Sequence, residues 1–359
     1  MKVLISTNTT QRVNEVLLGQ IKLFLSRQHK VIILAQKNHD LDIDINAEVR
    51  FINLKTYPHS YNFLSNIILV FKYIYYYNIL NPDLIIHSTI KSNIFGGLAA
   101  RILNKKYYST ISGLGNTFFN KQFFNTILKF FYICSQKKAS KVLFQNIWDK
   151  NVFTNKGFID SNKCSIVPAG KDLKIFNKKK YIRKIKKFNF LYIGRLVQEK
   201  GIYNFLDAAT ELSKKYTDIH FYVIGEISRS NDNIKNRYSS RQINFLGYKK
   251  NIQQFLVNTD CLVLPSFREG MSNVLMEAGC FGKPSITSNV PGCKDIITHN
   301  YNGLLCEKKN TTSLKKQMEK YFKLEKIQKI EMGNNAFLNI QKNFNIKLVD
   351  DYYIKLLEI

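Results

Sequence analysis

The stretch DCLVLPSFREGMSNVLMEAGCFGKPSITSNVPG, residues 260–292, decides the fold. Its apolar run 261–265 has the length and pattern of a buried parallel strand. A loop follows, and helical spacing then begins near Ser272, with apolar residues at Val274, Leu275, Ala278 and Phe281. Gly282-Lys283-Pro284 ends the helix, and a second strand is predicted at 285–287. The stretch therefore predicts a strand–loop–helix–strand unit.

Two carboxylates are placed at the edge of this unit where ligands bind. In α/β sheets, ligands sit beyond the carboxyl ends of the strands, and helix N-termini present N–H groups to anions. Glu269 lies in the loop, and Glu277 lies on the order of 7–8 Å further along the helix axis. One carboxylate can face a reacting centre while the other reaches a distant part of the same ligand. The alternative for either residue is a solvated surface Glu.

The same alternation of strands and helices recurs along the chain. It begins with strands at 3–5, 31–34 and 83–87, and it restarts at 190–193. This pattern predicts an α/β fold with two Rossmann-like, doubly wound parallel-sheet domains. The expected boundaries are 1–172 for the first domain, 173–187 for a basic linker, 188–340 for the second domain and 341–359 for a last helix.

Composition limits the class of protein. The chain has 359 residues, of which 45% are hydrophobic, enough for two packed domains. Its net charge is +28, which favours polyanionic partners such as nucleic acid, acidic membranes or phosphorylated ligands. Six cysteines without a CxxC pair indicate reduced thiols of a cytosolic protein. The run 63–80 is interrupted by Asn66, Lys72 and Asn78, so we expect no membrane span and, from the N-terminal strand, no signal peptide.

Glu269 and Glu277 carry a specific resemblance. With Gly-Met-Ser-Asn between them, and Gly-Lys-Pro, Pro-Gly and Asn302-Gly303 after them, they resemble the donor-site signature of retaining GT-B glycosyltransferases. Those enzymes use nucleotide sugars without a metal. The resemblance covers nearly the whole chain and implies two domains facing a central cleft, with the acceptor in the first and the donor in the second. It also implies a last helix that crosses back to the first domain, no metal and no cofactor.

The resemblance implies roles for residues of the second domain. Arg195 and Lys200, after Gly194, would neutralise a diphosphate leaving group, whose negative charge grows as the bond breaks. Glu269 would be the catalytic residue that stabilises positive charge at the anomeric carbon, and Glu277 would accept hydrogen bonds from ribose hydroxyls. Further donor contacts are expected at the helix N-terminus, from Gly270, Met271, Ser272, Asn273 and Val274. A solvated Arg and Lys are the alternative for the cation pair.

Two motifs of the first domain resemble bacterial transferases that extend polyprenyl-diphosphate-linked sugars. Residues 88–93 resemble a Thr-Ile-Lys-Pro-Asn motif in which Ser92 replaces the proline, and residues 112–118 resemble a Gly-Leu-Gly loop. A packed, neutral His87 and a plain turn at 112–118 are the alternatives. The candidate acceptor contacts are His87, Thr89, Lys91, Gly113, Gly115 and Asn116.

Three further segments leave alternatives open. Residues 118–138 are rich in aromatics and carry only positive charges, which fits either an interfacial helix or a core helix. Asp40 to Asp44 has the DxD spacing of a metal site, but its alternation also fits a half-buried edge strand. Residues 167–172 resemble the landmark that closes the first domain, and Lys171 within them has no assigned role.

The sequence thus predicts a retaining, metal-independent glycosyltransferase. It would move a sugar from a UDP-sugar to a saccharide linked to polyprenyl diphosphate, during capsule or O-antigen polysaccharide assembly. The expected location is cytoplasmic, peripheral on the inner face of the cell membrane. A nucleotide-sugar epimerase of the same architecture would need no acceptor and is the nearest alternative. A basic nucleic-acid-binding protein would leave Glu269 and Glu277 without a role, and no nucleic acid is expected as a partner.

Overall fold

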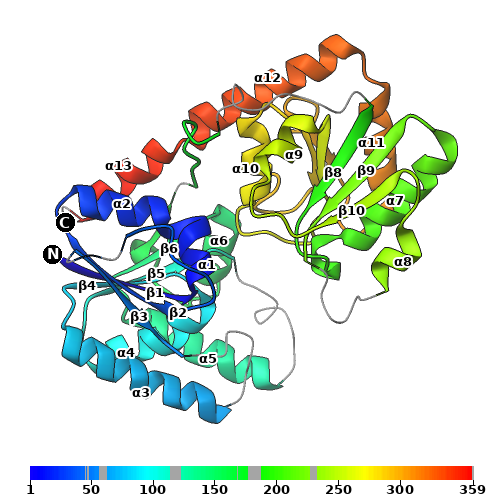
Figure 1. Ribbon diagram of the computed structural model, residues 1–359. Coiled ribbons are helices and arrows are strands. Elements are labelled where there is room, and N and C mark those ends of the chain that lie inside the picture. The colour runs from blue at the N-terminus through cyan, green and yellow to red at the C-terminus, as the bar shows by residue number, and fades with distance from the viewer. Residues whose placement is uncertain are drawn as a thin grey trace. The chain divides into compact units, whose positions relative to one another are not determined.

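The computed structural model describes residues 1–44, 46, 48–55, 63–113, 123–167, 169–176, 187–226 and 233–357. The chain forms two compact units, each with its own core. The first unit comprises Met1–Val167 and Asp350–Ile359, and the second comprises Pro168–Val349 (Figure 1).

In the described residues of the first unit, seven parallel strands form one sheet with the order β3-β2-β1-β4-β5-β6-β7. The strands are β1 (Lys2–Thr9), β2 (Lys30–Gln36), β3 (Val49–Asn53), β4 (Leu84–His87), β5 (Tyr107–Ile111), β6 (Lys141–Phe144) and β7 (Cys164–Ile166). The helices are α1 (Thr10–Arg12), α2 (Leu18–Ser26), α3 (Phe63–Leu80), α4 (Gly97–Ile102), α5 (Phe123–Lys137) and α6 (Ile147–Asn155), with π-helical turns at Val13–Leu17 and Ser92–Gly96.

The second unit repeats this plan with six parallel strands among its described residues, in the order β10-β9-β8-β11-β12-β13. The strands are β8 (Phe188–Ile193), β9 (Ile219–Ile224), β10 (Ile243–Gly247), β11 (Cys261–Leu264), β12 (Ser285–Ser288) and β13 (Gly303–Cys306). The helices are α7 (Ile202–Lys215), α8 (Ile234–Tyr238), α9 (Gln253–Asn258), α10 (Asn273–Cys280), α11 (Thr311–Lys323) and α12 (Lys326–Asn343). The last helix, α13 (Ile346–Leu357), begins in this unit and ends in the first.

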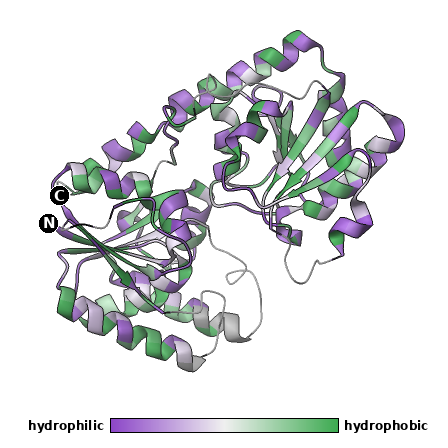
Figure 2. Cartoon of the chain, viewed as in Figure 1, coloured by the Kyte–Doolittle hydropathy of each residue, from purple (hydrophilic) through white to green (hydrophobic). Residues whose placement is uncertain are grey.

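The predicted α/β fold with two doubly wound parallel sheets is confirmed. The strands of both sheets are largely hydrophobic (Figure 2) because helices cover parallel sheets on both faces. In each sheet the strand order reverses at one place, between β1 and β4 and between β8 and β11. Ligands of doubly wound sheets bind at the carboxyl edge beside such a reversal. The opening stretch supplies β11, α10 and β12, as predicted.

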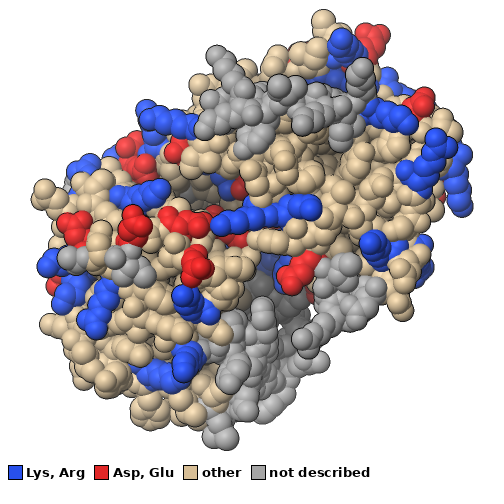
Figure 3. Space-filling view, viewed as in Figure 1, with Lys and Arg blue, Asp and Glu red and all other residues tan. Residues whose placement is uncertain are grey.

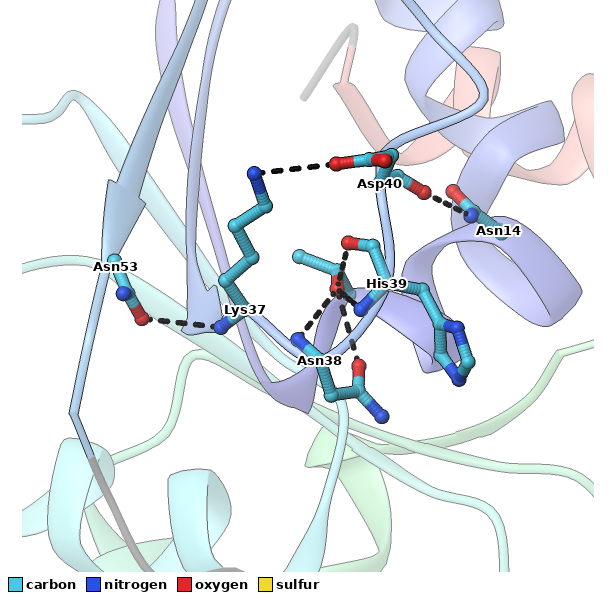
Figure 4. A network of polar contacts seen from close by, with 7 residues as sticks. Asn14, Lys37, Asn38, His39, Asp40 and Asn53 are labelled. Carbon is cyan, nitrogen blue, oxygen red and sulfur yellow. Dashed lines mark hydrogen bonds and ion pairs between the residues drawn. The ribbon is translucent and has the colours of Figure 1, made fainter.

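The interpretation of Asp40 to Asp44 as an edge strand is wrong, because these residues lie in a loop after β2. Thr10 holds this loop: its hydroxyl accepts hydrogen bonds from the backbone N–H groups of Asn38 and His39, at 3.1 and 3.0 Å. The carboxylate of Asp40 pairs with Lys37 at 3.1 Å (Figure 4). The loop is therefore fixed by side chains and not by sheet pairing.

The segment before β8 is only partly a linker. Leu173 and Phe176 pack against the core of the second unit, and Lys171 is buried. The backbone of Lys171 also pairs with Asn345 in an isolated parallel bridge. Sequence composition missed this packing because the segment is dominated by lysine. Residues 177–186, the rest of the predicted linker, lie outside the described residues.

The described part of the aromatic segment 118–138 packs partly as a core helix, and the interfacial interpretation stays a prediction. Helix α5 occupies its second part, and Tyr132 packs inside with its ring 5.7 Å from that of Phe153. Phe130 is instead exposed. Residues 118–122 and the side chains of Phe123 and Phe124 lie outside the described structure. Among the described residues, no helix combines the length and apolar character needed to cross a bilayer.

Candidate active site

The candidate donor site lies at the carboxyl edge of the second sheet, where the loops after β8 and β11 meet. Gly201 makes this approach possible: its φ is +70°, and a Cβ there would lie 2.1 Å from the carbonyl oxygen of Pro265. A backbone hydrogen bond of 2.8 Å from the Phe267 N–H to the Glu199 carbonyl adds a second link. The two loops are thus held in contact by backbone, and side chains at their tips take defined positions.

Lys200 and Glu269 form an ion pair at this contact. The Lys200 ammonium lies 2.5 Å from Glu269 Oε1, and their side chains are only 24% and 11% exposed. Ser266 donates a hydrogen bond to the same carboxylate oxygen at 2.8 Å. Burial and the negative charge of Glu269 raise the pKa of the Tyr192 hydroxyl, which lies 3.4 Å from the Lys200 carbonyl oxygen. The structure therefore brings together the predicted diphosphate cation and the predicted catalytic carboxylate.

The turn at Pro291-Gly292 supports the loop that carries Glu269. Gly292 has a φ of +77°, and a Cβ there would lie 2.6 Å from the carbonyl oxygens of both Glu269 and Gly270. Its own carbonyl accepts a hydrogen bond of 3.1 Å from the Ser272 N–H. The Ser272 N–H is therefore hydrogen-bonded within the protein, and the predicted contact of Ser272 with the nucleotide sugar stays a prediction.

Helix α10 begins at Asn273, directly after this turn. The N–H groups of the first helical turn have no carbonyl partner within a helix, and in the described structure the Ser272 hydroxyl makes no capping hydrogen bond. Asn273 is exposed and Val274 half-buried, so this end of the helix faces solvent. The positive end of α10 is thus suited to bind an anionic group. Met271, also predicted as a donor contact, lies just before this end of the helix.

Glu277 lies further along α10 and pairs with Lys171, a residue whose role could not be predicted from the sequence. The Lys171 ammonium lies 2.5 Å from Glu277 Oε1, and the two side chains are 10% and 17% exposed. The Lys171 ammonium also lies 5.9 Å from the ring centroid of Phe176. No spacing rule could find this pair, because 105 residues separate its members in the sequence.

Gly194 and Arg195 complete the expected donor residues. The Gly194 N–H donates to the Ile224 carbonyl at 3.0 Å, and a Cβ on Gly225 would lie 1.9 Å from the Gly194 carbonyl oxygen. Arg195 is exposed next to this crossing, and its carbonyl accepts a hydrogen bond from Tyr192 at 3.0 Å. The Arg195 backbone is fixed while its guanidinium group is open to solvent.

In the first unit, polar residues gather at the carboxyl edge near the reversal between β1 and β4. Thr89 donates to Asn8 at 2.7 Å, and Lys91, which follows, is mostly buried, which lowers its pKa. Arg12 donates from Nη2 to the Ser112 hydroxyl at 3.1 Å. Within the described part of the chain, its buried Nε has no hydrogen-bond partner. Asn8 and Arg12 were not predicted from the sequence, because neither belongs to a motif.

His87 does not face this edge. It is fully buried, and its Nε2 shares a hydrogen bond of 2.9 Å with the Tyr77 hydroxyl. Burial lowers the pKa of His87 to about 3. The packed, neutral alternative therefore fits His87, and we do not retain it among the acceptor contacts. Gly113, with a φ of +140°, ends the described part of its loop; Gly115 and Asn116 lie outside the described residues.

Comparisons with known proteins agree with these observations. Residues 2–146 match the family described as "Glycosyl transferase 4-like", and residues 174–338 match "Glycosyl transferases group 1". The N,N'-diacetylbacillosaminyl-diphospho-undecaprenol alpha-1,3-N-acetylgalactosaminyltransferase of Campylobacter jejuni is 26% identical, over 94% of this chain and 93% of that protein. The UDP-Gal:alpha-D-GlcNAc-diphosphoundecaprenol alpha-1,3-galactosyltransferase of Escherichia coli is 27% identical, over 76% and 75%.

Solved structures show the same fold at lower identity. HepE of Anabaena, in complex with UDP and glucose, has a TM-score of 0.79 at 16% identity, over 100% of this chain and 99% of that one. Sucrose-phosphate synthase of Thermosynechococcus elongatus has a TM-score of 0.83, also at 16% identity, over 100% and 98%. The two family matches cover most of the chain without overlapping, and each falls on one of the two units. The chain is therefore an enzyme of the GT-B glycosyltransferases, with a glycosyl transferase 4-like first half and a group 1 second half.

Proposed function

We propose that this glycosyltransferase transfers a sugar from a UDP-sugar to a saccharide linked to polyprenyl diphosphate, with retention of configuration and without a metal. The observation that carries the donor half of this proposal is the Lys200–Glu269 ion pair beside the N-terminus of α10. A cation, a carboxylate and a helix N-terminus meet there within one unit. Transfer from a nucleoside diphosphate sugar needs these three groups at its reacting end.

The chemistry of each group follows from the charges that develop during transfer. As the bond from the anomeric carbon to the diphosphate breaks, negative charge grows on the leaving oxygen and positive charge on the sugar. Lys200, Arg195 and the positive end of α10 stabilise the leaving group, and Glu269 stabilises the sugar. Both interactions strengthen in the transition state, so they raise the rate of transfer.

Glu277 is proposed to accept hydrogen bonds from the ribose hydroxyls of the donor. Lys171 holds Oε1 of its carboxylate, so Lys171 fixes the direction in which the other oxygen points. A carboxylate held in this way loses little conformational freedom when the nucleotide binds. Lys171 is therefore a positioning residue in this proposal.

The acceptor half of the proposal rests on the relatives and on the first unit. Both curated relatives named above are described as acting on sugars joined to undecaprenol through a diphosphate. Arg12, with its unpartnered Nε, supplies a cation suited to a diphosphate at the carboxyl edge of the first sheet. A third relative, 23% identical, is a capsular polysaccharide biosynthesis glycosyltransferase of Staphylococcus aureus, which supports a role in cell-surface polysaccharide assembly. Such an acceptor stays in the bilayer, so the enzyme would be peripheral on the inner face of the cell membrane.

The donor is tested by thermal unfolding with a panel of UDP- and GDP-sugars, because a ligand that binds only the folded state raises its stability. UDP-N-acetylgalactosamine and UDP-galactose should protect, and the GDP-sugars should not. Transfer is then measured with a synthetic polyprenyl-diphosphate-linked N-acetylhexosamine, in EDTA and with added magnesium. Retention is read from the anomeric proton of the product by NMR. Equal rates in EDTA and magnesium and an α-linked product are expected.

Three outcomes would contradict the proposal, in whole or in part. An activity that EDTA abolishes and magnesium restores would reopen the metal interpretation of Asp40 to Asp44. Conversion of a nucleotide sugar into its epimer without acceptor would favour the epimerase alternative. Protection by a GDP-sugar with no effect of UDP-sugars would contradict the donor class alone.

A further inference from the structure

Helix α3 of the first unit is apolar on both of its faces. Its inner face enters the core of the unit through Leu69, Tyr73, Tyr77 and Leu80. Its outer face carries five large hydrophobic side chains that are each between 40% and 65% exposed: Ile67, Ile68, Phe71, Tyr75 and Ile79. A helix at the surface of a soluble protein normally carries polar residues on its outer face. Apart from the exposed Asn78, the outer face of α3 therefore has the composition of a buried surface.

These five residues form one continuous stripe along the helix, called here the α3 stripe. Their spacing repeats at three or four residues, and the stripe runs for roughly 18 Å at about 1.5 Å per residue. Lys72 is the single charged residue in the sequence of α3, and its ammonium donates a hydrogen bond of 3.0 Å to the Lys55 carbonyl. Contiguous apolar surfaces of this kind mark a binding surface for a protein or a membrane.

Helices α4 and α5 follow α3 on the same side of the sheet, with α4 packed against both α3 and α5 (Figure 1). Lys105, just after α4, donates a hydrogen bond to Asn81 at the end of α3. Arg101 of α4 donates to the carbonyl of Cys134 in α5 at 2.9 Å. Two more large hydrophobic side chains, Ile102 of α4 and Phe130 of α5, are exposed on these helices.

Charge distinguishes the possible occupants of this surface. Residues 63–138, which contain α3, α4 and α5, hold nine Lys and Arg residues and a single acidic residue, Asp83; of the nine, Lys91 is buried at the carboxyl edge of the sheet. In Figure 3 the surface over α3 is mostly free of charge, with basic groups beside it. A second copy of this chain would bring two basic surfaces together, which repel. A bilayer with anionic headgroups offers an apolar interior to the stripe and negative charge to its flanks.

We propose that the α3 stripe, flanked by the basic residues of α4 and α5, is the surface on which this protein docks to an anionic lipid bilayer. The large hydrophobic side chains enter the boundary between headgroups and acyl chains, and the lysines and arginines contact the phosphates. The proposal deepens the peripheral membrane association stated under the proposed function and rests on it. It assigns that association to α3, whose run 63–80 was predicted from the sequence not to span a membrane and was given no other role.

The test is flotation of the full chain with vesicles of neutral phosphatidylcholine, alone or with about 30% anionic phosphatidylglycerol. The test variant changes Ile68, Phe71 and Ile79 to Gln, since Gln favours helix and keeps the exposed helix soluble. A matched control changes three equally exposed hydrophobic residues of α12 in the second unit, Ile327, Ile330 and Leu338, to Gln. Circular dichroism melting shows that each variant is folded.

The wild type should float with the anionic vesicles and be released between about 0.05 M and about 0.5 M salt. The α3 variant should bind at least about tenfold more weakly, because three inserted side chains are lost. The α12 control should bind like the wild type. Wild-type binding by the α3 variant, or no flotation of the wild type at low salt, would overturn the proposal. So would a dimer in light scattering that the α3 variant dissociates, since the occupant would then be a second copy.

Failure of the docking surface and failure of the proposed function are distinguishable. Vesicle binding needs neither donor nor acceptor. Transfer to a short-chain, water-soluble diphosphate acceptor needs no vesicles, and the α3 variant should perform it at the wild-type rate. Loss of that transfer in the wild type would contradict the proposed function while leaving the docking result in place.

Discussion

Replacing Lys171 by Met gives a measurable test of the ion pair that holds Glu277. The pair joins Lys171 Nζ and Glu277 Oε1 at 2.5 Å, with side chains 10% and 17% exposed. Removing the cation leaves a carboxylate with little access to water. Breaking a buried pair on one side costs about 3–5 kcal/mol, and we expect about 3 kcal/mol because some solvent reaches this pair. For a unit of this size, that loss lowers the melting temperature by roughly 6–12 °C.

The assay is thermal unfolding followed by circular dichroism, with UDP present in a parallel sample to identify the transition of the second unit. Glu277→Gln in the Lys171→Met background removes the stranded charge, so the double variant should recover most of the lost stability. Lys215→Met is the control, because Lys215 pairs with Glu319 on the exposed surface of the same unit. Its melting temperature should stay near that of the wild type. A shift below about 3 °C for Lys171→Met, or a double variant no more stable than the single one, would refute the reasoning.

Three further predictions concern the active site and one buried histidine. Glu269→Gln should lower kcat by a large factor and change the donor KM by only a few-fold, because its interaction with the sugar develops in the transition state; equal effects on both constants would contradict this role. Arg195→Ala should remove about 3–4 kcal/mol of transition-state stabilisation, read from the fall in kcat/KM in steady-state transfer assays; a fall in kcat/KM of less than tenfold would exclude Arg195 from the diphosphate site. Burial lowers the pKa of His87 to about 3, so the folded first unit excludes a proton that the unfolded chain binds below about pH 6.5. Stability should therefore be full above that pH and fall by roughly 1.4 kcal/mol per pH unit below it, down to about pH 3; urea unfolding of His87→Gln should show a flatter dependence by this amount.

Local patterns in the sequence predicted the alternation of strands and helices but only part of each sheet. Residues 261–264 form a parallel strand where a short apolar run indicated one, α10 ends before Gly282 as its breaker predicted, and the next strand follows at 285–288. The loop at Asp40 did not follow its alternating pattern. The side chain of Thr10, from another part of the chain, holds that loop by accepting its backbone hydrogen bonds. The alternation of polar and apolar residues at 40–44 carries no information about the hydrogen bonds of Thr10, because these form only in the tertiary structure.

The candidate site, too, was predicted from the sequence only in part. Lys200 and Glu269 were predicted separately, each from a motif, and the structure adds that they are paired. Arg12 belongs to no motif, and Lys171 lies in a motif that assigned it no role; their partners Ser112 and Glu277 were found only in the folded structure. For His87 the sequence left a functional and a packed role open. Burial decides for the packed role, because the end of β4 lies under α3 and its Tyr77.

The large positive charge of the chain is a property whose meaning composition leaves open. A net charge of +28 favours any polyanion, and on its own it fits nucleic acid as well as a membrane. At the candidate donor site, however, Lys200 and Lys171 are already paired with carboxylates and add no net charge there. Part of the excess lies in residues 63–138, where nine basic residues accompany one acidic residue and the exposed apolar face of α3. Nucleic acid offers phosphates but no apolar interior for such a face, whereas an anionic bilayer offers both. The combination of charge with exposed hydrophobic surface therefore favours lipid as the polyanion that this enzyme meets.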